Sequence, residues 1–167
     1  MHITTAELYN QYYSASRNLY LGDTEMPNHC HNRVTVYSAN THDVAKIKQM
    51  FEDENCFGQI IPEPDWPNTP NKDGELPVKH EDPWLTYRWS NGRQDDRWYD
   101  WRIQNWDTKW DCYDVVVTDD DPESVEIEFN TAWSPPEAIC NQIREDYPDV
   151  SVSWFYDEPG CEIAGYL

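Results

Sequence analysis

The chain has 167 residues, and its 32 Asp and Glu against 12 Lys and Arg give a formal net charge of −20. Its length predicts one domain that buries roughly two-thirds of its unfolded surface without disulfide support. The acidic balance argues against direct binding of nucleic acid, and the lack of a long uncharged apolar stretch argues against a membrane span.

The cysteines predict a reducing compartment. The five residues are widely spaced and form no Cys-x-x-Cys pair, which argues against a disulfide framework and a zinc ribbon. The first residues, Met1-His-Ile-Thr-Thr-Ala-Glu, lack a basic region followed by an apolar run, so no export signal is expected. We therefore expect a cytoplasmic protein with no cofactor and no bound metal.

In chain order, residues 1–25 predict a Tyr-rich amphipathic helix that packs on a domain formed by residues 26–167. Alternating residues predict a strand over 33–37, and an apolar stripe predicts a helix over 41–53. Residues 57–83 contain six prolines, which exclude helix and interior strand over most of that stretch. They predict a long loop.

The second half predicts a helix from about 94–96 to 104, then a β-hairpin of residues 113–118 and 125–133 with its turn at 119–122. In the second strand we expect one buried face and one exposed face. The buried residues are Val125, Ile127, Phe129, Thr131 and Trp133, and the exposed residues are Glu126, Glu128 and Asn130.

A helix follows Ser134 and ends before Pro148, and strands are predicted over 150–156 and 161–166. The whole order predicts an α+β fold with a ferredoxin-like split βαβ antiparallel sheet. An extra N-terminal helix, a long Pro-rich loop and a Trp-rich helical insertion are added to it.

Three motifs carry a resemblance to a known family: Pro27-Asn-His-Cys-His-Asn-Arg33, Trp101-Arg-Ile-Gln-Asn-Trp-Asp-Thr-Lys-Trp-Asp111 and Thr131-Ala-Trp-Ser-Pro-Pro136. In this order they resemble the YubB-type ferredoxin-like family of small proteins encoded by bacteriophages and plasmids, over residues 26–167. His29 stands where that family tends to have Trp, and Asp107 where it tends to have Gly. Because Asp tolerates a left-handed turn better than most residues, we expect the turn to remain. The resemblance implies the fold and a phage or plasmid origin, but no settled activity.

The Trp-rich segment mixes aromatic and cationic side chains, as in surfaces that stack bases and neutralise phosphate. Its candidate ligand-binding residues are Arg97, Trp98, Trp101, Arg102, Asn105 and Lys109. Interleaved Asp residues leave its local charge near zero, however. We favour the interpretation that its tryptophans, like Trp133, are structural, with Arg102 and Asn105 bound to backbone carbonyls.

No motif indicates a catalytic or metal site. Asp119, Asp120, Asp121 and Glu123 are typical of a hard-cation cluster, but they fall on a predicted tight turn without the glycine spacing of a calcium loop. His29-Cys30-His31 lacks a second pair of zinc ligands. Nucleophile, phosphate-loop and metalloprotease motifs are absent. A Trp-lined groove with two carboxylates would imitate a glycosidase, but the sequence does not select the pair.

The C-terminal third is almost purely acidic. From Asp111 onward, 15 acidic residues accompany one basic residue, Arg144. A compact chain of this length is roughly 40 Å across, and duplex DNA of that length carries about 24 charges. Glu126 and Glu128 would lie about 6.8 Å apart along a strand, a spacing on the scale of a phosphate array. The charge therefore suggests DNA mimicry, but on charge alone we favour the alternative of an acidic, well-solvated protein without such a partner.

With the phage or plasmid context, this charge predicts a non-enzymatic inhibitor of a host defence or nucleic-acid enzyme, of the anti-CRISPR or anti-restriction type. It would bind the basic surface of that host protein. The candidate contact residues are Asp119, Asp120, Asp121, Glu123, Glu126 and Glu128. The alternatives are a ligand- or nucleotide-binding module that uses the Trp-rich segment, and an enzyme of unknown reaction.

Overall fold

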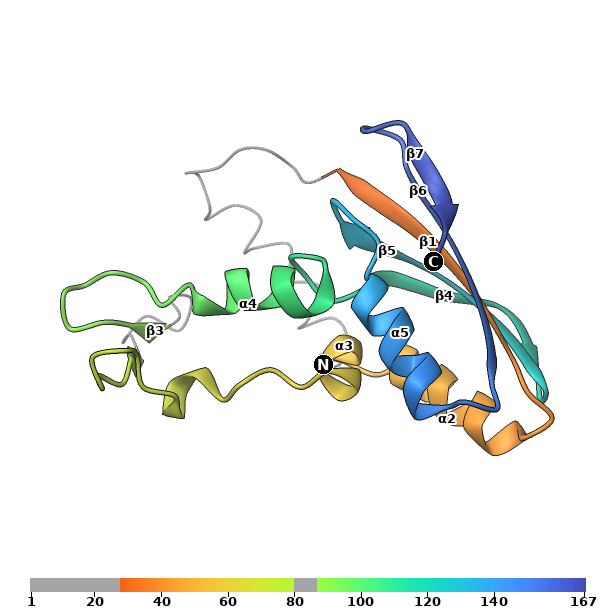
Figure 1. Cartoon of the computed structure of the whole chain (residues 1–167), viewed down its shortest axis with the longest axis horizontal. Coiled ribbons are helices and arrows are strands. Elements are labelled where there is room, and N and C mark those ends of the chain that lie inside the picture. The colour runs from red at the N-terminus through yellow and green to blue at the C-terminus, as the bar shows by residue number, and fades with distance from the viewer. Residues whose placement is uncertain (1–27, 80–86) are drawn as a thin grey trace, which may run out of the picture.

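The computed structural model describes residues 28–79 and 87–167 (Figure 1). Its main feature is a five-stranded antiparallel sheet with the strand order β4-β5-β1-β6-β7. The strands are β1 (His29–Tyr37), β4 (Tyr113–Asp121), β5 (Ser124–Ala132), β6 (Ser151–Glu158) and β7 (Ile163–Tyr166). The predicted helix over residues 1–25 lies outside the described residues.

Two helices join these strands and pack on one face of the sheet. Helix α2 (Thr41–Glu52) follows β1, and α5 (Glu137–Asp146) connects β5 to β6 (Figure 1). The order β1-α2-β4-β5-α5-β6, with β1 between β5 and β6, is the split βαβ arrangement. The fold is therefore a ferredoxin-like α+β domain, as predicted, and β7 extends the sheet beyond β6.

The core lies between the helices and the sheet, and alternation along the strands fills it. In β5, Val125, Ile127 and Phe129 are buried, as predicted. Phe129 packs edge-on against Trp154 of β6, with ring centroids 5.5 Å apart. Helix α2 buries Val44, Ile47 and Phe51, and α5 buries Ile139, Cys140 and Ile143. The spacing of these residues explains why both segments form helices with one apolar side.

Trp133 was expected in the core, and this prediction is wrong. The residue is 40% exposed, because β5 ends at Ala132 and Trp133 adopts a left-handed backbone conformation with φ 74°. The alternation that governs β5 therefore does not extend to this residue.

The hairpin turn is also tighter than predicted. Strand β4 runs through Asp121, and only Pro122 and Glu123 form the turn. The carboxylate of Asp121 accepts a hydrogen bond of 3.0 Å from the backbone N–H of Glu123. This local contact closes the turn without the four residues that the sequence suggested.

Between α2 and β4, an extended arm projects from the sheet and its helices (Figure 1). It begins at the short helix α3 (Cys56–Ile60) and continues through the 3-10 turn η1 (Trp66–Asn68) and strands β2 (Val78–Lys79) and β3 (Tyr87–Arg88). Helix α4 (Arg97–Trp106), close to its predicted bounds, returns the chain to the domain. The prediction of a loop over 57–83 is wrong at its start, since residues 57–60 are helical.

Candidate interaction face

The second face of the sheet, which we call the open face, is not covered by any helix among residues 28–79 and 87–167. It presents the side chains that alternate with the core residues. Strand register places Glu128 of β5 beside Arg33 of β1, Arg33 beside Phe155 of β6, and Phe155 beside Tyr166 of β7. An antiparallel sheet commonly leaves one face to solvent or to a partner.

Aromatic side chains and one ion pair occupy the middle of the open face. Arg33 donates to Glu128 at 2.8 Å, and this hydrogen bond raises the pKa of Arg33. Phe155 and Tyr166 pack edge-on with ring centroids 5.3 Å apart, while Tyr166 remains 73% exposed. A shallow depression of about 330 Å³ is lined by Arg33, Phe155 and Tyr166 together with Thr35, Glu126 and Ser153. Exposed aromatic rings beside a charged pair are typical of protein contact surfaces.

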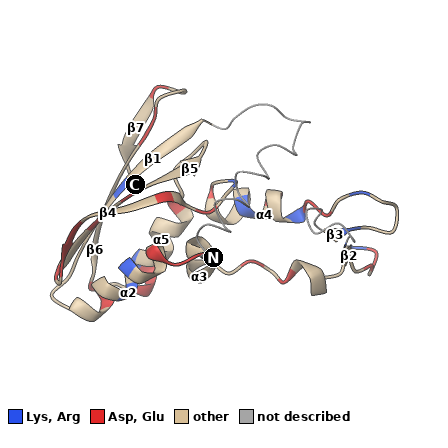
Figure 2. Cartoon of the chain, turned by 180° about the vertical axis from the view of Figure 1, so that it is seen from behind, with Lys and Arg blue, Asp and Glu red and all other residues tan. Residues whose placement is uncertain are grey.

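Acidic residues are concentrated where the β4–β5 hairpin closes (Figure 2). Asp119 lies directly opposite Glu126, and Asp121 lies opposite Ser124. Like charges at opposed positions in neighbouring strands destabilise a sheet. We define the acidic hairpin end as Asp119, Asp121, Glu123 and Glu126; among the described residues none of the four forms an ion pair.

The other two predicted contact residues are neutralised within the chain. Lys48 of α2 binds Asp120 at 2.6 Å, and this hydrogen bond raises the pKa of Lys48. Arg33 binds Glu128 at 2.8 Å. Glu126, Glu128 and Asn130 were expected to be exposed, but all three are only half-exposed. Neighbouring side chains cover them in part, since Thr118 also donates to Glu126 at 2.9 Å.

The acidic C-terminal third does not form one continuous negative face. The hairpin carries the group described above, whereas Glu137, Glu145 and Asp146 belong to α5, on the other side of the sheet (Figure 2). The acidic hairpin end differs from these residues in two ways. It places like charges opposite each other, and its Glu126 lines the same depression as Phe155 and Tyr166, which we call the aromatic centre of the open face.

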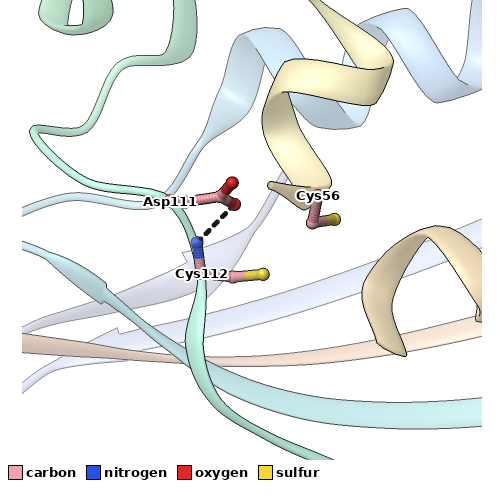
Figure 3. A group of neighbouring side chains, drawn as sticks. All are labelled: Cys56, Asp111 and Cys112. Atoms are coloured by element: carbon pink, nitrogen blue, oxygen red, sulfur yellow. Dashed lines mark hydrogen bonds between the residues drawn. The ribbon is translucent and has the colours of Figure 1, made fainter. Parts of the chain in front are cut away.

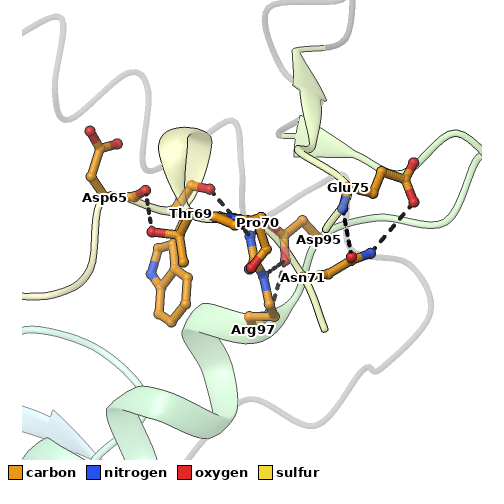
Figure 4. Close-up of polar contacts among 8 residues, drawn as sticks. Asp65, Thr69, Pro70, Asn71, Glu75, Asp95 and Arg97 are labelled. Atoms are coloured by element: carbon orange, nitrogen blue, oxygen red, sulfur yellow. Dashed lines mark hydrogen bonds and ion pairs between the residues drawn. The ribbon is translucent and has the colours of Figure 1, made fainter. Parts of the chain in front are cut away.

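In the Trp-rich segment, the side chain of Arg97 contacts the arm (Figure 4). Its guanidinium donates to the backbone oxygens of Trp66, Thr69 and Pro70 at 3.2, 2.9 and 3.2 Å. It also pairs with the buried carboxylate of Asp95 at 2.8 Å, and hydrogen bonding to Asp95 raises the pKa of Arg97. These contacts occupy the donors that a phosphate would need.

The other candidate ligand-binding residues are also engaged within the chain. Arg102 was expected to bind a backbone carbonyl, and this is wrong, because it binds the carboxylate of Glu63 through two hydrogen bonds of 2.6 and 2.9 Å. Its guanidinium stacks on the half-buried Trp98 and on Trp106. Asn105 donates to the backbone oxygen of Trp101, and Lys109 lies over the rings of Tyr99 and Trp110. Trp106 is fully buried, and the partly buried Trp101 packs against the core. The segment therefore makes mainly structural contacts.

The comparisons with known proteins concern the fold. Residues 105–167 match the family model described as the ferredoxin-like domain in Api92-like protein. None of the curated proteins compared with this chain matches it. A solved structure, protein Api92 from Yersinia pseudotuberculosis, is 11% identical, with a TM-score of 0.49 over 84% of this chain and 93% of that chain.

The family match supports the ferredoxin-like fold implied by the resemblance to YubB-type proteins. The phage or plasmid origin remains an expectation. Among the described residues, no helix has the length and apolarity needed to cross a membrane.

Sequence reasoning missed the aromatic centre of the open face. Phe155 and Tyr166 were assigned to strands but not to any site, because their pairing with Arg33 depends on strand register. The alternation of Arg33 with buried Asn32 and Val34 was the available signal that Arg33 faces outward.

Proposed function

We propose that this chain is a non-enzymatic, phage- or plasmid-encoded protein that inhibits a host defence or nucleic-acid enzyme by binding its basic surface. The acidic hairpin end carries the proposal. Its four carboxylates form no ion pair within the described part of the chain, and two of them oppose each other in register. A cationic partner would relieve their repulsion, so binding and local charge are physically linked.

The neighbouring open face supports a protein partner over a small ligand. The depression beside Arg33 is shallow, while Tyr166 and Tyr37 are exposed by 73% and 52%. Exposed aromatic residues provide the apolar contacts that fix a protein complex, and the acidic residues accelerate its formation by long-range attraction. The proposal places this interaction in the host cytoplasm, where nucleic-acid enzymes present basic grooves.

A charge-neutral variant tests the proposal. The variant is D119N/D121N/E123Q/E126Q, and each replacement keeps an oxygen that can accept the bonds formed by Asp121 and Glu126. The immobilised wild-type chain should capture a basic nucleic-acid enzyme from a bacterial lysate, and DNA should compete for that enzyme. The variant should capture it at least about ten-fold less well, since several charge contacts are lost.

A matched control changes the same number of charges elsewhere. E54Q, D73N, E145Q and D149N lie at exposed positions outside the hairpin, and together they should leave capture unchanged. Inhibition should follow the ratio of inhibitor to enzyme, because a binding protein acts stoichiometrically and an enzyme does not. Equal capture by both variants, a partner without a basic surface, or inhibition at catalytic amounts would refute the proposal.

A further inference from the structure

Three possible metal ligands lie together where the start of α3 meets the residues that precede β4 (Figure 3). Cys56 is the first residue of α3, while Asp111 and Cys112 directly precede β4. The two sulfur atoms and a carboxylate oxygen of Asp111 all lie within 4.8 Å of one another. Cys56 is buried, and the other two residues are half-buried.

The carboxylate of Asp111 is held in place by the backbone. Its Oδ1 accepts hydrogen bonds from the N–H groups of Phe57 and Cys112 at 3.0 and 2.7 Å. Its Oδ2 is buried and has no hydrogen-bond partner in the described part of the chain. A structural role at the start of α3 accounts for Oδ1 alone. A buried carboxylate oxygen without a partner is costly, and a cation bound by this carboxylate would offset that cost.

The donor set fits a thiophilic divalent cation. Zinc binds sulfur at about 2.3 Å and carboxylate oxygen at about 2.0–2.2 Å, so tetrahedral donors lie roughly 3.5–3.8 Å apart. Donors already within 4.8 Å of one another need to approach by only about 1 Å to reach that geometry. Two sulfur ligands also favour zinc over calcium or magnesium, which prefer oxygen alone.

We propose that Cys56, Asp111 and Cys112 bind one Zn²⁺ ion and leave a fourth position for water or an exchangeable ligand. Each thiol releases its proton to solvent as the metal binds. The hydrogen bonds to Oδ1 orient the carboxylate, as outer-shell contacts commonly do for metal ligands. Burial raises the pKa of Asp111, and the positive charge of Arg102 opposes that shift.

Cobalt binding to the reduced, full-length chain tests this site. One equivalent of Co²⁺ should produce a thiolate-to-cobalt charge-transfer absorption, and Zn²⁺ should displace the cobalt. C112S should abolish the absorption, and D111N should weaken cobalt binding by about ten-fold or more. The amide introduced by D111N keeps an oxygen for the two backbone N–H groups, so the fold should remain intact.

Two cysteines outside the cluster provide controls. C161S removes an exposed thiol and C140S a buried one, and both variants should bind cobalt like the wild type. Circular dichroism should show that every variant is folded. The proposal is overturned if the folded wild type gives no charge-transfer absorption, if C112S retains it, or if C161S alone removes it. It is also overturned if Cys56 and Cys112 form a disulfide in the presence of excess Zn²⁺.

Discussion

Two tryptophans show how one residue type serves different roles in this fold. Trp106 is fully buried, its indole N–H donates to the backbone oxygen of Ile61 at 2.9 Å, and its ring packs edge-on against Phe57. Trp133 is 40% exposed and follows the last residue of β5. The sequence assigned both to the structural core.

We expect W106A to lower the free energy of unfolding by about 3–5 kcal/mol, because it removes a large core side chain and the hydrogen bond to the backbone oxygen of Ile61. W133A should cost less than half as much, since it leaves no comparable cavity. Urea unfolding measures both values. Equal losses would show that Trp133 is more tightly packed than its exposure indicates.

Asp107 combines two local roles at the end of α4. Its backbone is left-handed, with φ 62°, so the expected turn is present despite the absence of Gly. Its carboxylate accepts a hydrogen bond of 2.8 Å from the N–H of Ala138. Pro136, at the N-cap of α5, provides no side-chain cap. Asp107 therefore supplies a cap that Gly would not.

We expect the order of stability at position 107 to be wild type and D107N first, then D107G, then D107A. Asn keeps both the acceptor and the tolerance for a left-handed turn, whereas Gly keeps only the turn and Ala keeps neither. D107A should lose about 1–2 kcal/mol of unfolding free energy. Thermal and urea unfolding of the three variants test the order, and a D107G protein less stable than D107A would contradict it.

At the scale of helices and strands, the local periodicity of apolar residues was enough to predict most of the elements of the fold. The residues of α2, α5 and β5 repeat at the spacing of one buried face, so their type and orientation followed from the sequence. The arm was not predictable in the same way. Its shape depends on contacts such as Arg97 with Thr69, which join residues 28 positions apart.

The candidate site was predictable in part for the same reason. The acidic residues of the hairpin were visible in the sequence, but their pairing was not. Arg33 binds Glu128 across 95 residues, and Lys48 binds Asp120 across 72. Cys56 and Cys112 lie close together because α3 packs beside the start of β4, and no short sequence motif indicates that contact.

Arg97 should determine the order of the arm. We expect R97K to accelerate hydrogen exchange in residues 66–79 by about ten-fold or more, because an ammonium cannot form the same planar fork of hydrogen bonds. Protection of β1 and β5 should not change. R93K, at an exposed position, is the matched control. Uniform acceleration across the whole chain would show that the arm and the sheet unfold as one unit instead.

At the scale of the whole molecule, net charge acts on folding and on the proposed binding in opposite directions. A net charge of −20 brings many like charges together when the chain folds. This self-repulsion destabilises the compact state, and salt screens it within a Debye length of about 10 Å at 0.1 M. The same screening weakens attraction between the acidic hairpin end and a basic partner.

We therefore expect the melting temperature to rise as NaCl increases from about 0.02 to 0.3 M, while the association rate with a basic partner falls over the same range. The D119N/D121N/E123Q/E126Q variant should start from a higher melting temperature at low salt and respond less, because it no longer places two carboxylates opposite each other. Differential scanning calorimetry and stopped-flow binding measure the two responses.

A control with the four replacements at Glu54, Asp73, Glu145 and Asp149 has the same net charge, so any difference in association rate between the variants arises from the hairpin itself. If both variants associate equally fast, net charge alone governs the encounter and the hairpin has no special role.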